Sequence, residues 1–281
     1  MAIIFNAQDK YDSLLAEIKT ELTRMPKLCL ASVVIGENIA AKSYCSVQEK
    51  IAKELGIEFC YHGFEADLPF KEFKNQIRNL NNTKEVTGII LNKPFPSNWS
   101  DADVFSLLSE DKDIEGMHPA NLGRFFIGQP KFISPTALSV IEIIKESGVK
   151  LYGAKVTLVG FSSLIGRPLA LWLGNEFATV SITHIATNEK GDIPAYVSNA
   201  DIVISAVGKS EIIKGEWIKP GAVVIDVGVG HKDNKISGDI EFDKAKERAA
   251  FITPVPGGVG KLTTIFLCYN LVLAYKLGLK G

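Results

Sequence analysis

The sequence has almost no net charge, little cysteine and no long apolar run. With a net charge of −1 over 281 residues, composition gives no reason to expect nucleic acid or an anionic membrane as a partner. The four cysteines show neither a CxxC pair nor a zinc-type spacing, which predicts reduced core thiols and no metal site. No apolar stretch reaches about 18 residues, and no basic segment precedes a long apolar run at the N-terminus, so we expect a cytoplasmic protein without a membrane span.

What is present is a regular alternation of helix-like and strand-like segments. Hydrophobic residues make up 46% of the chain, enough to bury the core of two domains or one large one. In the N-terminal region we expect helices over 8–24, 42–55, 70–81 and 101–108, and strands over 28–35, 57–63 and 88–91. This order predicts a parallel, three-layer α/β domain. Residues 117–133 are expected to be irregular, and a helix over 136–146 is expected to lead into a second domain.

The second domain is predicted to open with a phosphate-binding turn. A strand over 155–159 is followed at once by Gly160-Phe-Ser-Ser-Leu-Ile-Gly166-Arg-Pro168 and a helix to residue 173. A strand, a glycine-containing turn and a helix N-terminus form a phosphate cradle, because free amide groups and the positive end of the helix dipole face the anion. The spacing differs from the GxGxxG fingerprint, so a βα fold with incidental glycines is the alternative.

The context of that turn favours a dinucleotide site. Further strands are expected over 180–184, 201–206 and 222–227, and the last two are followed by glycines, Gly208 and Gly228. Small residues just past the carboxyl ends of strands are where a nicotinamide dinucleotide lies in a doubly wound sheet.

Residues 253–260 read Thr-Pro-Val-Pro-Gly-Gly-Val-Gly, between a strand-like segment over 250–252 and an apolar helix expected over 262–277. Two prolines fix φ and remove amide donors, while three glycines remove side chains and permit positive φ. An enzyme tolerates this entropic cost where its backbone approaches a flat ligand closely. The segment therefore predicts one wall of an active site, with a surface turn as the alternative.

Several motifs then occur in a characteristic order. They are Lys-Ser-Tyr44-Cys, Gly88-Ile-Ile-Leu-Asn-Lys-Pro-Phe-Pro96, Asp111-Lys-Asp-Ile-Glu-Gly-Met-His-Pro119, Asn121-Leu-Gly123, Ala206-Val-Gly208 and Asp226-Val-Gly228. Together with the segments 160–168 and 253–260, they resemble the methylenetetrahydrofolate dehydrogenase/methenyltetrahydrofolate cyclohydrolase family over nearly the whole chain.

The resemblance implies a fold and an activity. The fold would be two three-layer α/β domains: a folate-binding domain of residues 1–123 plus 262–281, and a Rossmann-type parallel-sheet domain of residues 124–261. The active site would lie in the cleft between them, in an assembly that is usually a homodimer. The activity would be the NAD(P)-dependent oxidation of 5,10-methylenetetrahydrofolate to 5,10-methenyltetrahydrofolate by hydride transfer.

The resemblance also implies site residues. Tyr44, Gln48, Asn92 and Glu115 would be catalytic, with Tyr44, Asn92 and Glu115 also binding substrate and Glu115 accepting hydrogen bonds from the amino-pyrimidine edge of the pterin. The remaining substrate-binding residues would be Lys93, Pro94, Pro256, Gly257, Gly258 and Lys261. The cofactor-binding residues would be Gly160, Phe161, Ser162, Ser163, Ile165, Gly166, His184, Ala206, Val207, Gly208, Asp226, Gly228 and Thr263. No metal is expected, because no histidine or cysteine completes a coordination set near the acidic residues around Glu115.

Some positions depart from the family pattern. The family lysine one helical turn after Tyr44 is Gln48 here, and Lys50 lies roughly 200° further around the helix, on another face. The other replaced residues on the folate side are a glutamine by Asn92, a leucine by Lys93, an aspartate by Glu115 and a proline by Lys261.

These departures affect the two activities differently. Hydride transfer needs the two rings positioned, because the folate nitrogens stabilise the resulting cation. Hydrolysis needs a general acid/base, worth roughly 10²–10⁴-fold, and glutamine does not titrate. The sequence therefore predicts a dehydrogenase with a weak or absent cyclohydrolase step. The alternatives are a bifunctional enzyme that uses a relocated Lys93 or Lys261, and a paralogue that binds a dinucleotide but is non-catalytic or acts on another one-carbon carrier.

Cofactor choice depends on two positions that in many relatives hold the 2′-phosphate of NADP. An arginine after the first glycine of the turn is replaced by Phe161, and a Ser-Lys or Ser-Arg pair after His184 is replaced by Ile185-Ala186. Without a nearby cation a phosphate dianion is poorly matched, which slightly favours NAD over NADP. Arg167 and Lys190 are the alternative phosphate ligands.

Overall fold

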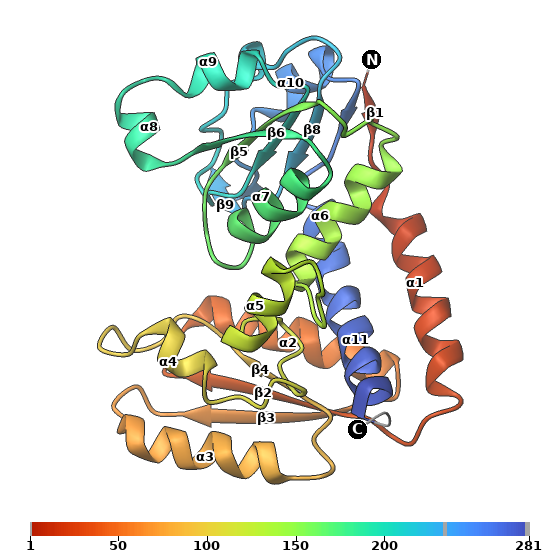
Figure 1. Cartoon of the computed structure of the whole chain (residues 1–281), viewed down its shortest axis with the longest axis vertical. Coiled ribbons are helices and arrows are strands. Elements are labelled where there is room, and N and C mark those ends of the chain that lie inside the picture. Colours follow the sequence, from red (N-terminus) through yellow and green to blue (C-terminus); the bar gives the residue numbers. More distant parts are fainter. Residues whose placement is uncertain (1, 233–234, 279–281) are drawn as a thin grey trace. The chain divides into compact units, whose positions relative to one another are not determined.

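The structure is a computed structural model that describes residues 2–232 and 235–278 (Figure 1). The chain divides into two compact units, Asp12–Pro135 with Thr264–Gly281, and Met1–Tyr11 with Thr136–Thr263. We call them the three-stranded unit and the six-stranded unit after their main sheets. Among the described residues, none of the helices combines the length and the apolar character of a membrane span.

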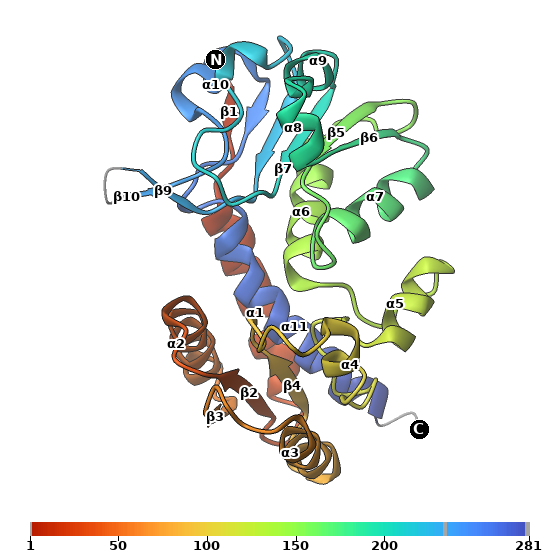
Figure 2. The ribbon, with the colours of Figure 1, turned by 90° about the vertical axis from the view of Figure 1, so that its left-hand side faces the viewer.

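The three-stranded unit is built on a parallel sheet in the order β3-β2-β4. The strands are β2 (Cys29–Ile35), β3 (Glu58–Phe64) and β4 (Gly88–Leu91). All seven residues of β2 are buried, as expected of a central strand covered on both faces. The helices α2 (Ile39–Glu54) and α11 (Val259–Gly278) cover one face, and α3 (Phe70–Asn82) covers the other (Figures 1 and 2).

Residue alternation along the strands explains which helix meets which face. Ser32 of β2 contacts Gln48 of α2, and a Cβ on Gly88 of β4 would lie 2.7 Å from Leu271 of α11. On the opposite face, Phe64 of β3 packs edge-on against Phe73 of α3. Because successive side chains point to opposite faces, odd positions of β2 face α3 and even positions face α2.

The six-stranded unit contains a parallel sheet in the order β1-β11-β8-β7-β5-β6. Its strands are β1 (Ile3–Ile4), β5 (Lys155–Val159), β6 (Thr179–Thr183), β7 (Ile202–Ser205), β8 (Val223–Asp226) and β11 (Phe251–Ile252). The chain moves outward from β5 to β6 and then returns to the other side of β5 with β7. This reversal is the topological switch point at which doubly wound sheets bind ligands.

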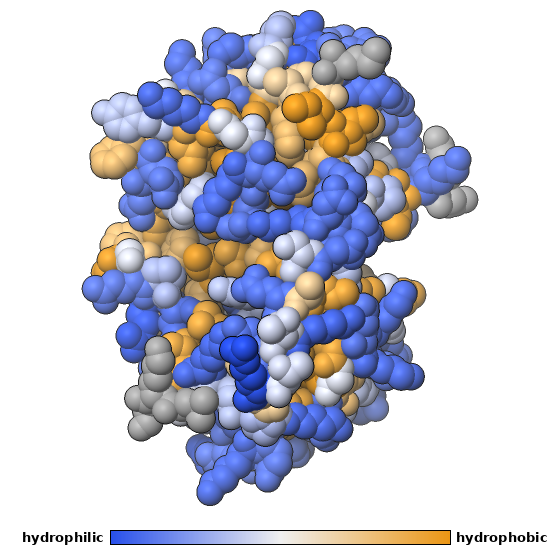
Figure 3. All heavy atoms as spheres, turned by 90° about the vertical axis from the view of Figure 1, so that its right-hand side faces the viewer, coloured by the Kyte–Doolittle hydropathy of each residue, from blue (hydrophilic) through white to orange (hydrophobic). Residues whose placement is uncertain are grey.

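Helices lie on both faces of the six-stranded sheet. In Figure 2, α6 (Pro135–Glu146) and α7 (Gly166–Asn175) lie on one side. On the other, α9 (Ile193–Ser198) and α10 (Phe242–Arg248) bury apolar side chains against β7 and β8. Figure 3 shows apolar side chains at the surface of this unit, among mostly polar ones, and the exposed large apolar residues include Ile3 and Ile4 of β1.

Most predicted elements are confirmed, but the irregular segment is not. Within residues 117–133, Pro119–Phe126 forms helix α5. His118 caps it by accepting a hydrogen bond from the Ala120 amide at 3.1 Å, and Pro119 occupies the first turn, where a missing amide hydrogen costs nothing. The sequence did not predict strand β1, the helices α8 (Ile185–Glu189), α9 and α10, or the 3-10 helix Gly215–Trp217. It also did not predict the antiparallel pair of β9 (Gly230–Lys232) and β10 (Lys235–Ser237). Helix α4 is shorter than expected, Asp101–Phe105.

The boundaries of the two units also differ from the expected 1–123 plus 262–281 and 124–261. The first residues join the six-stranded unit because β1 pairs with β11. Residues 124–135 join the three-stranded unit, where Asn270 of α11 donates hydrogen bonds to the carbonyls of both Ile114 and Ile133, at 2.7 and 2.9 Å. The first difference comes from strand pairing and the second from a buried side-chain amide. Neither contact leaves a periodic pattern in the sequence.

Candidate functional site

Three neutral polar side chains form a closed, buried network in the three-stranded unit. Ser32 of β2 donates to Gln48 Oε1 at 2.7 Å, Gln48 Nε2 donates to Asn92 Oδ1 at 3.0 Å, and Asn92 Nδ2 donates to Ser32 Oγ at 2.9 Å. Asn92 also donates to the Val33 carbonyl at 2.9 Å. Ser32 and Gln48 are fully buried. The structure therefore brings the predicted site residues Gln48 and Asn92 into direct contact, and it adds Ser32, which sequence reasoning missed.

Tyr44 extends this network by one helical turn. It lies four residues before Gln48 on α2 and shares a side-chain hydrogen bond with it. Burial raises the pKa of the Tyr44 phenol well above its usual range, and the nearby Glu115 carboxylate raises it further. Tyr44 is therefore neutral at physiological pH and acts as a hydrogen-bonding and packing group.

Two carboxyl groups follow β4 on the segment that leads to α5. Asp113 is fully buried; its Oδ2 accepts the His118 amide at 2.6 Å and Asn121 Nδ2 at 2.8 Å. Glu115 keeps part of its surface exposed, but dense surroundings, and then the charge of Asp113, raise its pKa to about 8. Asp113 therefore anchors the segment, while Glu115 has no hydrogen bond or ion pair with any residue that the structure describes.

The two lysines considered as relocated bases have other partners. Lys93 forms an ion pair with Asp101 and lies 6.0 Å from the centre of the Phe95 ring. Lys261 donates to Gln8 and lies 5.7 Å from the Tyr11 ring, within the six-stranded unit. These contacts disfavour either ammonium as a replacement for a lysine at position 48.

The segment Thr253–Gly260 forms a tight turn between β11 and α11 in the six-stranded unit. A Cβ on Gly258 would lie 2.4 Å from the Pro254 carbonyl oxygen, and Gly257 has a φ of 98°, which disfavours other residues at both places. The peptide bond before Pro256 is cis, as is that before Pro94. Thr253 accepts the Asp226 amide at 2.8 Å, which ties this turn to the end of β8.

The glycine turn after β5 has the geometry of a dinucleotide cradle. A Cβ on Gly160 would lie 2.5 Å from the Ala206 carbonyl, and a Cβ on Gly166 would lie 2.4 Å from the Gly160 carbonyl. Ser162 accepts the Ile165 amide at 3.2 Å, and α7 begins at Gly166. In the first turn of α7 the amides of Arg167 and Leu169 donate to the carbonyls of Ser162 and Ile165, at 3.0 and 3.1 Å, and Pro168 has no amide hydrogen. A pyrophosphate would therefore be held by the Gly166 amide and the positive end of the helix dipole, beside a turn whose glycines leave room for it.

Apolar side chains lie exposed around this turn. Phe161, Ile185 and Val207 follow the carboxyl ends of β5, β6 and β7 with exposures of 40%, 75% and 44%. Such residues provide apolar walls for the flat rings of a dinucleotide. The guanidinium of Arg167 lies 5.5 Å from the centre of the Phe161 ring, which places one cation beside the turn. His184 precedes α8, its amide donating to Thr187 Oγ1 at 3.3 Å.

The structure gives Asp226 a role in holding a loop, in addition to the cofactor contact that the resemblance implies. Its carboxylate accepts the amides of Gly228, Asp239 and Ile240 at 3.1, 3.1 and 2.9 Å, and burial raises its pKa to about 7. The side chain thus holds the loop after β8. The Thr263 hydroxyl forms a hydrogen bond within α11, donating to the Val259 carbonyl at 3.3 Å.

Asp239 is the residue on this side that the sequence did not reveal. Its carboxylate accepts Ser205 Oγ at 2.9 Å and the amides of Val207 and Lys209 at 2.7 and 2.8 Å. A Cβ on Gly228 would lie 2.0 Å from the Asp239 carboxyl carbon. Asp239 therefore fixes the loop that carries Val207 and Gly208, and it excludes any side chain at position 228.

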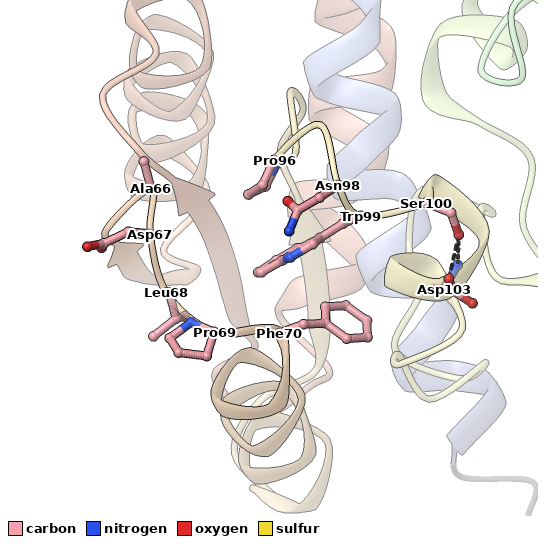
Figure 4. Close-up of a pocket in the computed structure, with 10 residues that line it drawn as sticks. All are labelled: Ala66, Asp67, Leu68, Pro69, Phe70, Pro96, Asn98, Trp99, Ser100 and Asp103. Carbon is pink, nitrogen blue, oxygen red and sulfur yellow. Dashed lines mark hydrogen bonds between the residues drawn. The ribbon is translucent and has the colours of Figure 1, made fainter.

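A separate pocket of about 450 Å³ lies at the carboxyl ends of β3 and β4 (Figure 4). Trp99 packs edge-on against Phe70, with ring centres 4.9 Å apart, and Asp67 and Asp103 add acidic groups to its lining. None of the predicted site residues lines this pocket.

Two family models match the chain. The tetrahydrofolate dehydrogenase/cyclohydrolase catalytic domain matches residues 6–115, and the NAD(P)-binding domain of the same family matches residues 134–278. The bifunctional protein FolD 2 of Geobacter metallireducens is 39% identical over 281 residues, covering 98% of each chain. The bifunctional protein FolD of Bacillus subtilis is 37% identical over 271 residues, covering 96% of this chain and 95% of its own.

Solved structures agree. The methylenetetrahydrofolate dehydrogenase-cyclohydrolase (FolD) of Trypanosoma brucei, complexed with NADP and an inhibitor, superposes with a TM-score of 0.94 at 30% identity, covering 100% of this chain and 99% of that one. The NAD-dependent 5,10-methylenetetrahydrofolate dehydrogenase of Saccharomyces cerevisiae, at 19% identity and a TM-score of 0.80 with 100% and 99% covered, shares the fold. The two-domain α/β fold expected from the sequence is confirmed.

The buried network predicts a measurable contribution to stability. Replacing Gln48 by methionine keeps the side-chain length but leaves Asn92 Oδ1 without its donor and leaves Ser32 Oγ only the weakly accepting Cys45 sulfur, at 3.0 Å. Each unpaired buried group costs about 1–3 kcal/mol, so Gln48→Met should lower the free energy of unfolding by at least that amount in urea titrations. Val47→Met, at the exposed neighbouring position of α2, is the control and should change it little. Equal midpoints for the two variants would contradict the network.

Proposed function

The chain belongs to the tetrahydrofolate dehydrogenase/cyclohydrolase family, and we propose that it oxidises 5,10-methylenetetrahydrofolate with NAD(P) but hydrolyses the methenyl product weakly or not at all. The observation that carries this proposal is Gln48, fully buried and hydrogen-bonded on both sides by Ser32 and Asn92. A neutral amide held in this way can orient a molecule but cannot take up or release a proton.

Dehydrogenation does not require a side chain that transfers a proton. When bound, NAD(P) accepts a hydride from the methylene carbon, and the folate nitrogens share the positive charge that results. The residues of this chain then have to bind the two rings at a reactive distance and exclude water, which is chiefly an entropic and steric contribution. The glycine turn Gly160–Gly166, the exposed Phe161 and Val207, and the backbone of Pro256–Gly258 suit that purpose.

Hydrolysis asks for a group that exchanges protons near neutral pH. Around Gln48, Ser32 and Asn92 are neutral, and the raised pKa of Tyr44 keeps its phenol protonated. Lys93 and Lys261 have partners elsewhere. Glu115 is the group here whose pKa, about 8, lies near neutrality. We propose that it holds the pterin and does not transfer protons: it is the partly exposed carboxyl group without a protein partner in the described part of this unit's site, and the pterin edge offers donors.

The first expected outcome is that methenyltetrahydrofolate accumulates. Purified protein supplied with methylenetetrahydrofolate and a dinucleotide should build up methenyl absorbance, because the enzyme adds little to the spontaneous hydrolysis rate. Gln48→Lys should gain hydrolysis of added methenyltetrahydrofolate, since Asn92 Oδ1 and Ser32 Oγ can accept from an ammonium whose pKa burial lowers. Hydrolysis by the unaltered protein well above the buffer rate would overturn the proposal.

The matched control for this gain is Gln48→Met, which lacks both the amide and an ammonium. It should gain no hydrolysis, so a gain in both variants would trace the activity to loosening of the site. If the unaltered protein does hydrolyse, Lys93→Ala and Lys261→Ala identify which lysine supplies the proton transfer.

The pH dependence of folate affinity tests Glu115. The ionised carboxylate accepts two pterin hydrogen bonds, and its pKa of about 8 in the free protein means that the ionised fraction grows as pH rises toward that value. Affinity for folate, measured by calorimetry, should therefore increase from about pH 6 to about pH 8 and then level off. Glu115→Ala should weaken binding by about 1–3 kcal/mol per unpaired pterin donor.

Glu115→Gln distinguishes the effect of Glu115 ionisation on folate affinity from the effect of its packing. It keeps the shape and one acceptor of the side chain but removes the ionisation, so its folate affinity should lose the rise with pH. A variant that keeps the rise would assign it to another group, such as the ligand itself. Unchanged affinity in both Glu115 variants would place this side chain outside the substrate site.

We propose that NAD serves at least as well as NADP. Support comes from the end of β6, where the exposed Ile185 and the neighbouring Ala186 occupy the place of a phosphate-binding pair. Charge-assisted hydrogen bonds contribute about 1.5–3 kcal/mol each, so the absence of two cations removes a strong NADP preference. The opposing feature is Arg167, whose guanidinium lies beside Phe161 at the turn.

Comparing kcat/KM for the two dinucleotides tests the cofactor assignment. The expected ratio is NAD equal to or above NADP, and a preference for NADP of about tenfold or more would refute it. In that case Arg167→Ala and Lys190→Ala distinguish the phosphate ligand, because only the residue that binds the 2′-phosphate should abolish the preference while leaving NAD turnover intact.

We also propose a homodimer, as the resemblance implies, in the cytoplasm, as the sequence composition leads us to expect. In its favour, the edge strand β1 exposes Ile3 and Ile4 at 68% and 50%, and an apolar sheet edge of this kind is a typical association surface. Sedimentation velocity measures the assembly directly.

A further inference from the structure

A second cluster of ligand-type side chains lies at the amino ends of β2 and β3. Cys29, Glu58 and Cys60 each offer one ligand atom, and the three atoms lie within 4.8 Å of one another. The two sulfur atoms are 3.3 Å apart, and Cys60 Sγ lies 3.9 Å from Glu58 Oε1. Spacing along the chain did not predict this meeting, because Cys29 and Cys60 belong to different strands.

Strand register brings the three residues together on one face. Cys29 pairs with Glu58, and Ala31 pairs with Cys60, so the side chains at 29, 58 and 60 all point to the α3 face of the parallel sheet. β3 is an edge strand, which leaves one side of the cluster open. Exposure increases outward, from the buried Cys29 through the half-buried Cys60 to the exposed Glu58.

We propose that Cys29, Cys60 and Glu58 bind one thiophilic divalent cation of the Zn²⁺ type, with water in the fourth position. Two thiolates and a carboxylate are ligands that such a cation prefers, whereas Mg²⁺ and Ca²⁺ prefer oxygen alone. Tetrahedral binding at about 2.3 Å per bond would separate the sulfurs by roughly 3.8 Å, so the two side chains need to move apart by only a few tenths of an ångström.

Charge in the surroundings is compatible with this site. The two thiol protons leave to solvent on binding, so the cation and its three ligands carry a net charge of −1. Lys27 lies 3.5 Å from Glu58 Oε2, and Lys112 interacts electrostatically with Cys29. Both ammonium groups offset the excess negative charge.

The cluster is independent of the folate site. Ser32 and Gln48 contact each other on the α2 face of β2, whereas Cys29 lies on the α3 face, at the opposite end of the strand from the Asn92 side chain that follows β4. A cation at Cys29 therefore contributes to the stability of the sheet edge, and loss of it can be measured without reference to dehydrogenase activity.

Metal titration of the reduced, chelator-treated protein tests the proposal. With Cd²⁺ as the optical probe and Zn²⁺ as the competitor, one equivalent should bind and give a thiolate-to-metal charge-transfer band. Cys60→Ser, a near-isosteric change on the edge strand, should abolish the band. Glu58→Gln should weaken affinity by more than the roughly 10- to 100-fold that the loss of an outer-shell partner causes. Zn²⁺ should also raise the unfolding midpoint of the unaltered protein but not that of Cys60→Ser.

The matched control is Glu54→Gln. Glu54 is an exposed carboxylate that pairs with Lys19 at 3.7 Å, much as Glu58 pairs with Lys27 at 3.5 Å, but it lies on α2, away from the sulfurs. It should leave affinity unchanged. Equal affinity in Glu58→Gln and the unaltered protein, a band that survives Cys60→Ser, or Mg²⁺ competing as well as Zn²⁺ would each overturn the assignment.

Discussion

The requirement that buried polar groups be paired determines the chemistry of residue 48. Ser32, Gln48 and Asn92 lie between β2, α2 and the end of β4, out of contact with water, and each donor in the ring has an acceptor in the next side chain. A lysine in this position would present an ammonium to two neutral oxygens in a medium that solvates charge poorly. Its pKa would fall, which is the property that a general base needs. Glutamine fits the same space without charge, so it favours a well-packed site over proton transfer.

The requirement that buried polar groups be paired also determines the loops after β7 and β8, where the dinucleotide is proposed to bind. Asp226 and Asp239 are buried carboxylates whose oxygens are occupied by six backbone or hydroxyl donors in all. They fix the loops after β7 and β8, and the space that they fill leaves room only for hydrogen at Gly228 and Gly238. The glycines at strand ends thus result from two needs, close approach of a ligand and close approach of a carboxylate. Sequence reasoning recognised only the first.

The sequence predicts site residues well where they lie on the same helix or strand. It predicts them poorly where their contact joins two separate elements. The helical period alone places Tyr44 and Gln48 on one face of α2, and the strand-end rule places Gly160 beside Ala206. Ser32 is different: a serine in an apolar strand is visible in the sequence, but its partners come from α2 and from a residue 60 positions away. The meeting of Cys29 with Cys60 likewise depends on the register of β2 with β3, which no single-strand pattern encodes. The family resemblance supplied Glu115, yet the raised pKa that gives this residue its proposed role depends on the density of its surroundings.

Strand β2 shows how one strand places two different side-chain clusters on opposite faces of a sheet. Its even positions face α2, where Ser32 completes a neutral network, and its odd positions face α3, where Cys29 meets a thiol and a carboxylate. A shift of register by one residue would exchange the two sets of side chains between faces. Ser32 would then lose Gln48 and Asn92, leaving buried polar groups unpaired, at a cost of about 1–3 kcal/mol each. The polar network on one face therefore helps to specify the register that assembles the sulfur cluster on the other.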